Sequence, residues 1–135
     1  MNADPIRLLI VDDHDKVRQG LIAFFDQEVD IEVVGSVSSG EEAVVAALET
    51  APDVVLMDLS MPGIGGIEAT RLLASAHPGL RVVMLTSFGG RDRFKEALKN
   101  GAVGYMLKDT APLELLRTLR YVARLRPSAE TAPSA

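Results

Sequence analysis

The chain of 135 residues contains no cysteine, and this absence excludes disulfide bonds and metal sites built from thiolates. It has no apolar stretch long enough to span a bilayer, so the sequence does not predict a membrane protein. No charged segment followed by an apolar one opens the chain, which argues against secretion. We therefore expect a cytoplasmic protein with no membrane contact.

An excess of basic residues is also missing. The chain has 14 Lys and Arg against 19 Asp and Glu, giving a formal net charge of -5 at pH 7. Because a protein that binds a phosphate backbone needs a basic face, this balance argues against direct nucleic-acid contact by this domain.

Length and composition indicate one globular domain. The chain is 47% hydrophobic and 24% charged, which is ordinary for a folded protein of this size with a real core. Residues 127–135 are rich in Pro, Ser and Ala, a composition typical of a flexible linker. We therefore predict a folded domain over residues 1–126 and a linker over 127–135.

Five short apolar runs alternate with segments of helical periodicity. The runs cover residues 6–11, 31–34, 54–57, 82–85 and 104–107, and each is typical of a buried strand. Between them, apolar residues recur at helical spacing, as at Val17, Leu21 and Phe25, and again at Val44 and Leu48. The alternation predicts an α/β fold: a doubly wound, five-stranded parallel sheet with helices on both faces, a (βα)5 flavodoxin-like arrangement with right-handed crossovers.

Asp58 ends one of these runs and is followed by a Pro-Gly turn signal at residues 62–63. In an open α/β sheet, ligands bind outside the carboxyl ends of the strands, so this position makes Asp58 a candidate reactive carboxylate. Taken alone, however, an Asp that caps the following turn is the preferred interpretation. The other strand ends decide between the two.

A second group of acids, Asp12, Asp13 and Asp15, follows the first apolar run. Two like charges about 4 Å apart cost roughly 4 kcal/mol at an effective dielectric constant of 20, which a bound cation relieves. Oxygen ligands without cysteine or paired histidines favour magnesium, manganese or calcium over zinc. A site with few protein ligands suits Mg²⁺ best, with Mn²⁺ as the other option.

Two further strand ends carry groups that can bind a phosphoryl oxygen. Thr86 offers a hydroxyl and Lys108 an ammonium group. Taken singly, a Thr that ends a strand reflects β-propensity, and a Lys there is a solvated charge. Together with a metal whose open positions phosphate oxygens can fill, they indicate phosphate chemistry.

Asp12-Asp13, Asp58, Thr86 and Lys108 on successive strand ends resemble the receiver domain of bacterial response regulators, the CheY-like family. The resemblance covers roughly residues 5–125. The segments Asp58 to Gly63 and Gly104 to Asp109, with Asp12-Asp13-His14, look like the NarL/FixJ subgroup, which carries a LuxR-type output.

This resemblance implies a phosphorylation switch of a two-component system. A sensor histidine kinase would supply a phosphoryl group, and Asp58 would accept it as an aspartyl phosphate. Asp13 and Asp58 would ligate Mg²⁺ directly, Asp12 would hold it through water, and the backbone carbonyl of Ser60 would complete the protein ligands. The domain would not be a conventional enzyme, because it would catalyse only its own phosphoryl transfer and autodephosphorylation.

The resemblance also implies how the switch is read. Lys108 would pair with a phosphoryl oxygen, and Thr86 would turn to hydrogen-bond the phosphoryl group. Tyr105 would move inward into the space that Thr86 leaves. Without the resemblance, a Tyr in a strand is ordinary half-buried packing.

Full-length relatives of this subgroup carry a C-terminal helix-turn-helix domain. We therefore expect the linker to lead to such an output domain, with homodimerisation on phosphorylation and transcriptional control through DNA bound by that domain. The alternative is a stand-alone or phosphorylation-independent receiver that acts as a protein-interaction module.

Two other classes share part of the pattern. A haloacid-dehalogenase-like phosphatase places a second Asp two residues after its nucleophile, where this chain has Ser60. A flavodoxin-like cofactor binder cradles phosphate in a Gly-rich or Ser/Thr-rich loop after the first strand, where this chain has acids that would repel it.

Overall fold

The computed structural model describes residues 4–87 and 91–124. They form five strands and five helices in strict alternation, in the order β1 (Ile6–Val11), α1 (Asp15–Phe25), β2 (Ile31–Val37), α2 (Gly40–Thr50), β3 (Val54–Asp58), α3 (Gly65–Ala76), β4 (Arg81–Thr86), α4 (Arg91–Lys99), β5 (Ala102–Leu107) and α5 (Pro112–Ala123). The linker predicted over 127–135 lies outside the described residues. No helix within the described ranges is long and apolar enough to cross a membrane.

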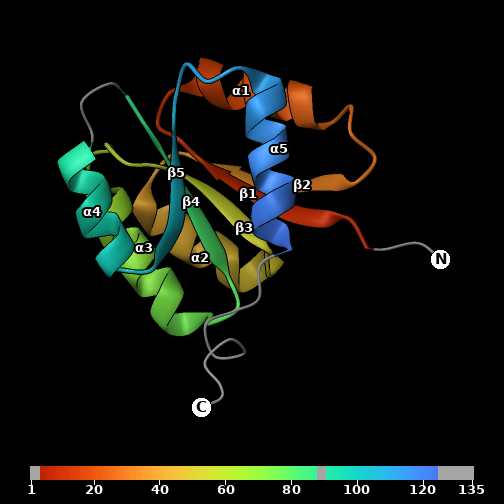
Figure 1. The fold of residues 1–135 in the computed structure, drawn as a ribbon. Helices are drawn as coiled ribbons and strands as arrows, with labels where there is room; N and C mark the ends of the chain where they lie inside the picture. Colours follow the sequence, from red (N-terminus) through yellow and green to blue (C-terminus); the bar gives the residue numbers. More distant parts are fainter. Residues whose placement is uncertain (1–3, 88–90, 125–135) are drawn as a thin grey trace, which may run out of the picture.

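The strands make one sheet in the order β2-β1-β3-β4-β5, and all its pairs are parallel. The helices cover both faces of the sheet (Figure 1), with α1 and α5 on one side and α2, α3 and α4 on the other. This confirms the predicted doubly wound, five-stranded α/β fold.

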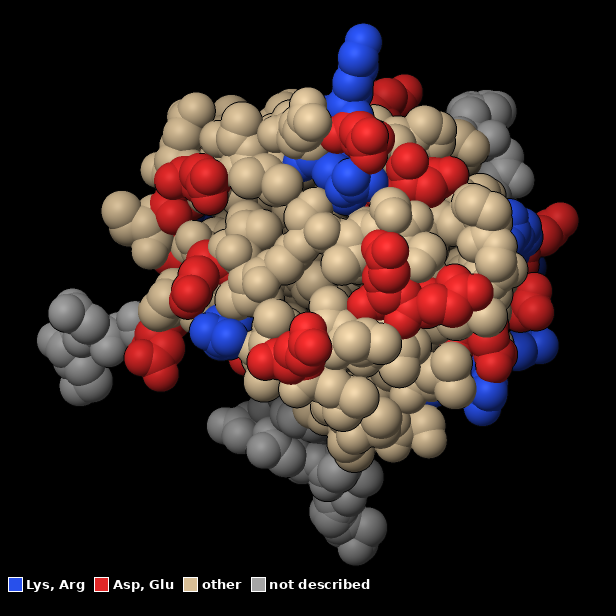
Figure 2. All heavy atoms as spheres, turned by 180° about the vertical axis from the view of Figure 1, so that it is seen from behind, with Lys and Arg blue, Asp and Glu red and all other residues tan. Residues whose placement is uncertain are grey.

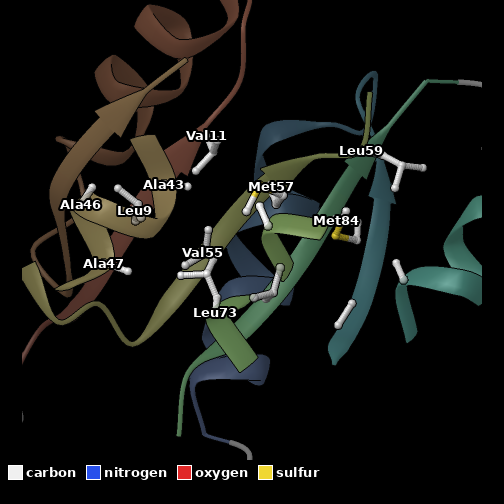
Figure 3. Packing of buried hydrophobic residues seen from close by; sticks show 14 residues of the cluster. Leu9, Val11, Ala43, Ala46, Ala47, Val55, Met57, Leu59, Leu73 and Met84 are labelled. Carbon is white, nitrogen blue, oxygen red and sulfur yellow. The ribbon is translucent and has the colours of Figure 1, made fainter. Parts of the chain in front are cut away.

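Alternation along each strand divides the core into two clusters. Leu9, Val55 and Met84 point toward α2, α3 and α4, as Figure 3 shows. Their neighbours Leu8 and Leu56 point to the other face and pack under α1 and α5. Because successive side chains point to opposite faces, a strand buried on both faces is a continuous apolar run, which is why these segments were recognisable in the sequence.

Two helices turn part of their predicted apolar face outward. Leu48 in α2 is 67% exposed and Val17 in α1 is 37% exposed. In α2 the small side chains of Ala43, Ala46 and Ala47 are the buried ones instead. The prediction that Leu48 faces the core is therefore wrong, because α2 packs through its alanines, whereas Val17 of α1 is partly covered.

Ion pairs join α5 to the segment between α1 and β2. The Arg120 guanidinium donates to both carboxylate oxygens of Asp30, at 2.7 and 2.9 Å, and to Glu28 at 3.0 Å. This hydrogen-bonded pairing lowers the pKa of Asp30 below its usual value. The ion pairs hold α5 against the turn between α1 and β2.

Candidate functional site

The order of the sheet places the predicted residues together. Val11 pairs with Met57 in the register of β1 and β3, so Asp12 and Asp58 lie side by side at the carboxyl ends of adjacent strands. Thr86 ends β4, next to β3, and pairs with Leu107, which directly precedes Lys108. Residues up to 96 positions apart in the sequence thus meet at one edge.

Backbone hydrogen bonds extend the ladders beyond the strand ends and fix these positions. Asp12 N donates to the Val37 carbonyl at 3.1 Å, and Lys108 N donates to the Thr86 carbonyl at 2.9 Å. Each functional side chain therefore stands on main chain that is held by a neighbouring strand.

Asp58 is buried, with 1% of its surface exposed, and both of its carboxylate oxygens are occupied. Oδ1 accepts from the backbone N–H of Ser60 at 3.1 Å, and Oδ2 accepts from Lys108 Nζ at 3.0 Å. Lys108 Nζ also lies 3.2 Å from Asp12 Oδ2, without the alignment of a hydrogen bond. One ammonium group thus faces two buried carboxylates.

The electrostatics of the site are unbalanced. Burial raises the pKa of Asp58 to about 6, and the neighbouring charge of Asp12 adds to this, although the hydrogen bonds from Lys108 and Ser60 oppose it. Burial disfavours the charged form of Lys108, but its hydrogen bond to Asp58 and the charges of Asp58 and Asp12 hold the pKa of Lys108 above its usual value. A single lysine does not compensate the acids around it.

Three carboxylates and a histidine form a cluster that can hold a cation. One ligand atom each from Asp12, Asp13, His14 and Asp58 lies within 4.8 Å of the others. Asp12 Oδ2 and Asp13 Oδ1 are buried and accept no hydrogen bond. Buried carboxylate oxygens without donors are costly unless a cation satisfies them, so the donor set fits a hard divalent metal.

His14 opens α1 and lies closer to this cluster than the sequence indicated. Its backbone N–H donates to Asp12 Oδ1 at 2.8 Å, and its Nδ1 lies 3.1 Å from the same atom and 3.2 Å from Asp13 Oδ1. Its side chain is 63% exposed. The contacts agree with a hydrogen-bonding group that positions the acids.

Among the described residues, the hydrogen bonds to Asp58 come from Ser60 and Lys108, and neither Thr86 nor Tyr105 donates one. Thr86 is buried and its hydroxyl donates to the backbone carbonyl of Ser87 at 3.1 Å. Tyr105 in β5 is 37% exposed, and its ring packs on Phe94 of α4 with the ring centroids 4.0 Å apart. In this structure, therefore, the threonine hydroxyl is engaged by the main chain next to it and the tyrosine is partly exposed.

The loop between β3 and α3 is held from both sides by residues that sequence reasoning missed. Glu41 in α2 accepts from the Ile64 N–H at 3.3 Å. Arg93 in α4 donates to Ser60 Oγ at 2.8 Å and to the Leu59 carbonyl at 3.3 Å. The basic residues of α4 look like a solvated face in the sequence, because no short-range pattern joins residues 33 positions apart.

Removal of the lysine provides a test of the charge distribution. In the Lys108→Met variant we expect the pKa of Asp58 to rise above about 6, because the hydrogen bond and the positive charge that lower it are lost. Carboxyl ¹³C NMR titration of metal-free protein measures this. The Lys99→Met variant, altered at an exposed position of α4, is the control, and an unchanged or lower pKa in Lys108→Met would contradict the assigned pairing.

Comparison with known proteins gives concordant matches. The model of the response regulator receiver domain family matches residues 8–120. The chain is 40% identical over 126 residues to the transcriptional regulatory protein LiaR of Bacillus subtilis, covering 93% of this chain and 60% of LiaR. The chain thus spans about three-fifths of the length of this relative and slightly less of the others that it matches.

Solved structures agree. The signal receiver domain of NarL from Mycobacterium tuberculosis superposes with a TM-score of 0.86 at 27% identity, covering 92% of this chain and all of that domain. CheY in the CheX-CheY-BeF3-Mg²⁺ complex of Borrelia burgdorferi superposes with a TM-score of 0.81 at 26% identity, covering 88% and 90% of the two chains.

Proposed function

Because this chain belongs to the response regulator receiver family, with relatives of the NarL/FixJ type, we propose that Asp58 accepts a phosphoryl group from a sensor histidine kinase. One observation carries the proposal: Asp58 is buried beside two further carboxylates and hydrogen-bonded to Lys108 at the carboxyl edge of the sheet. A buried acid of this kind destabilises the fold, and such groups are concentrated at functional sites.

The residues of the chain would each contribute to the transfer. A carboxylate oxygen of Asp58 attacks the phosphorus atom, a bond to phosphorus forms, and the bond between phosphorus and the kinase histidine nitrogen breaks with its electron pair left on the imidazole. Lys108 then donates to a phosphoryl oxygen. Phosphoryl transfer depends mostly on positioning and charge, and both groups are held on neighbouring strand ends.

The acidic cluster fits Mg²⁺, with Mn²⁺ as a substitute. In this proposal Asp13 and Asp58 would ligate the ion directly, Asp12 would hold it through water, and the backbone carbonyl of Ser60 would complete the set. The bound ion supplies positive charge for the transferring phosphoryl oxygens.

Thr86 and Tyr105 would form the switch. The Thr86 hydroxyl exchanges the Ser87 carbonyl for a phosphoryl oxygen, and the Tyr105 ring leaves Phe94 to fill the space behind it. Phosphorylation replaces the single negative charge of Asp58 with about -1.5 to -2 charges at neutral pH, which strengthens contacts available only in the second arrangement. A switch of this kind changes the relative populations of two conformations of the domain.

The intact protein would control transcription. The chain covers little more than half of its curated relatives, among which LiaR is a transcriptional regulatory protein. We infer that the linker leads to a DNA-binding helix-turn-helix domain and that phosphorylation promotes a homodimer. Acidic side chains are spread over the face seen in Figure 2, with basic ones mostly toward its edges, so the receiver itself offers that face poorly to DNA. In this proposal the domain catalyses only its own phosphorylation and autodephosphorylation. It acts in the cytoplasm.

The test is the intact mass of the protein after incubation with acetyl phosphate and Mg²⁺. We expect one phosphoryl adduct on the wild-type chain, none in the Asp58→Asn variant and none when a chelator is present. Asp15→Asn is the matched control, because Asp15 is a nearby exposed acid paired with Arg18 outside the cluster, and it should keep the adduct. A folded wild-type chain that gains no adduct would instead favour the phosphorylation-independent interaction module.

A further inference from the structure

Arg93 reaches the rim of the site from α4. Its Nη1 donates to Ser60 Oγ at 2.8 Å and its Nη2 to the Leu59 carbonyl at 3.3 Å. The backbone N–H of the same serine donates to Asp58 Oδ1, while Lys108 holds Asp58 Oδ2. Arg93 is therefore linked through Ser60 to the oxygen of Asp58 that the lysine does not hold.

The charge of this guanidinium is not neutralised. Both of its acceptors are uncharged oxygens, and among the described residues no carboxylate forms an ion pair with it. In contrast, Arg7, Arg18, Arg71 and Arg120 all pair with carboxylates. Arg93 thus offers a free positive charge and unused N–H donors beside the phosphorylation site.

A count of formal charges shows when this cation is needed. The carboxylates of Asp12, Asp13 and Asp58 would be balanced by Lys108 and the proposed divalent metal ion. On phosphorylation, Asp58 exchanges its single negative charge for the nearly doubly charged acyl phosphate. One negative charge is then left uncompensated, and Arg93 can supply the missing positive charge.

We propose that Arg93 is a phosphoryl-binding residue, held on Ser60 and Leu59 before phosphorylation and donating to the phosphoryl group afterwards. This inference rests on the proposed function of Asp58. A guanidinium binds phosphate oxygens through paired N–H donors, and such charge-assisted bonds are roughly twice as strong as bonds to neutral acceptors. The exchange of partners is therefore favourable once the phosphoryl group is present.

The position of Arg93 also links the phosphoryl group to α4. The next residue, Phe94, packs on the Tyr105 ring. When Arg93 turns to the phosphoryl group, the first turn of α4 loses its bonds to the loop after β3, and the inward movement of Tyr105 ends the contact between its ring and Phe94. The charge of the phosphoryl group thereby acts on α4 directly, in addition to any movement of Tyr105.

The experiment measures binding of beryllofluoride, an anionic phosphoryl analogue, in the presence of Mg²⁺ by thermal shift and ¹⁹F NMR. We expect Arg93→Gln to weaken binding at least tenfold, because a hydrogen bond to a charged group contributes roughly 1.5–3 kcal/mol. Arg93→Lys keeps the charge and should restore most of the affinity. Lys95→Gln removes a neighbouring exposed cation of α4 and should leave the affinity unchanged.

Three outcomes would overturn the inference. If Arg93→Gln binds beryllofluoride as tightly as the wild type, Arg93 has no role in binding the anion. Equal losses in Arg93→Gln and Arg93→Lys would make Arg93 a structural tether of the loop, and equal losses in Arg93→Gln and Lys95→Gln would reflect net charge alone. Failure of the wild type itself to bind beryllofluoride or to gain the adduct would instead reject the proposed function.

Discussion

Without metal at pH 7, the Asp58→Asn variant should be more stable than the wild-type protein, by on the order of 2–3 kcal/mol in the free energy of unfolding. The reason is that burial, aided by the charge of Asp12, raises the pKa of Asp58 from 3.8 to about 6. The ionised side chain therefore costs more in the folded than in the unfolded state. Asparagine keeps the shape of the side chain and removes the charge.

The same shift sets the pH dependence of the wild type. Between the unfolded pKa of 3.8 and the folded pKa of about 6, the folded protein binds more protons at Asp58 than the unfolded chain does. The contribution of this residue to stability therefore falls as pH rises through that window and stays low above it. In Asp58→Asn this contribution is absent.

Urea denaturation between pH 4 and 8 in the presence of a chelator measures both effects, with Asp15→Asn as the control for loss of an acid near the site. Added Mg²⁺ should stabilise the wild type by mass action and stabilise Asp58→Asn much less, since a proposed ligand is gone. If Asp58→Asn is no more stable than the wild type without metal, the raised pKa assigned to Asp58 is wrong.

Replacing Gly66 with alanine is expected to have a comparable effect in the opposite direction. A Cβ at this first-turn position of α3 would overlap the backbone carbonyl oxygen of Asp58 and lie 3.1 Å from Leu59 Cα. Neither obstacle is a flexible side chain that can turn aside, so α3 or the end of β3 must shift. Overpacking of this kind costs typically 1–3 kcal/mol, and contact with the main chain places this variant at about 3 kcal/mol.

The neighbouring glycine is a matched control for Gly66→Ala. Gly65 has a φ of +78° and no atom within 4 Å of a Cβ built there. Gly65→Ala should therefore cost only the backbone strain, about 1–2 kcal/mol. Urea denaturation gives the stabilities, and acetyl phosphate labelling should show slower formation of the adduct in Gly66→Ala, because the added Cβ presses on the main chain of Asp58. Equal behaviour of the two variants would contradict the close packing of α3 on β3.

The sequence predicted the strands well because each is a dense apolar run. In a sheet covered on both faces, both sets of alternating side chains must be apolar, and this leaves a signal that needs no tertiary information. Strand ends were less accurate: β2 continues to Val37 through Gly35 and Ser36, which the apolar run at 31–34 did not include. Main-chain pairing with β1 extends the strand where side chains give no sign of it.

The meeting of Asp12, Asp58, Thr86 and Lys108 also followed from the sequence, since parallel strands bring their carboxyl ends to one edge. The roles given to these residues remain proposals. Contacts that depend on how helices pack could not be foreseen in this way. The bond from Arg93 to Ser60 and the bond from Ile64 to Glu41 require the positions of α4 and α2 in space.

The attachment of α5 to the turn before β2 has a consequence during synthesis of the protein. Leu116 and Leu119 of α5 cover Leu8 and Phe25 in one core cluster, and Arg120 pairs with an acid 90 positions earlier in the chain. At a translation rate of about 5–20 residues per second, α5 follows Phe25 by roughly 5–20 s. Throughout that interval α1 alone can cover this face of the sheet, so the apolar area that α5 buries stays open to water and to chaperones until that helix has left the ribosome.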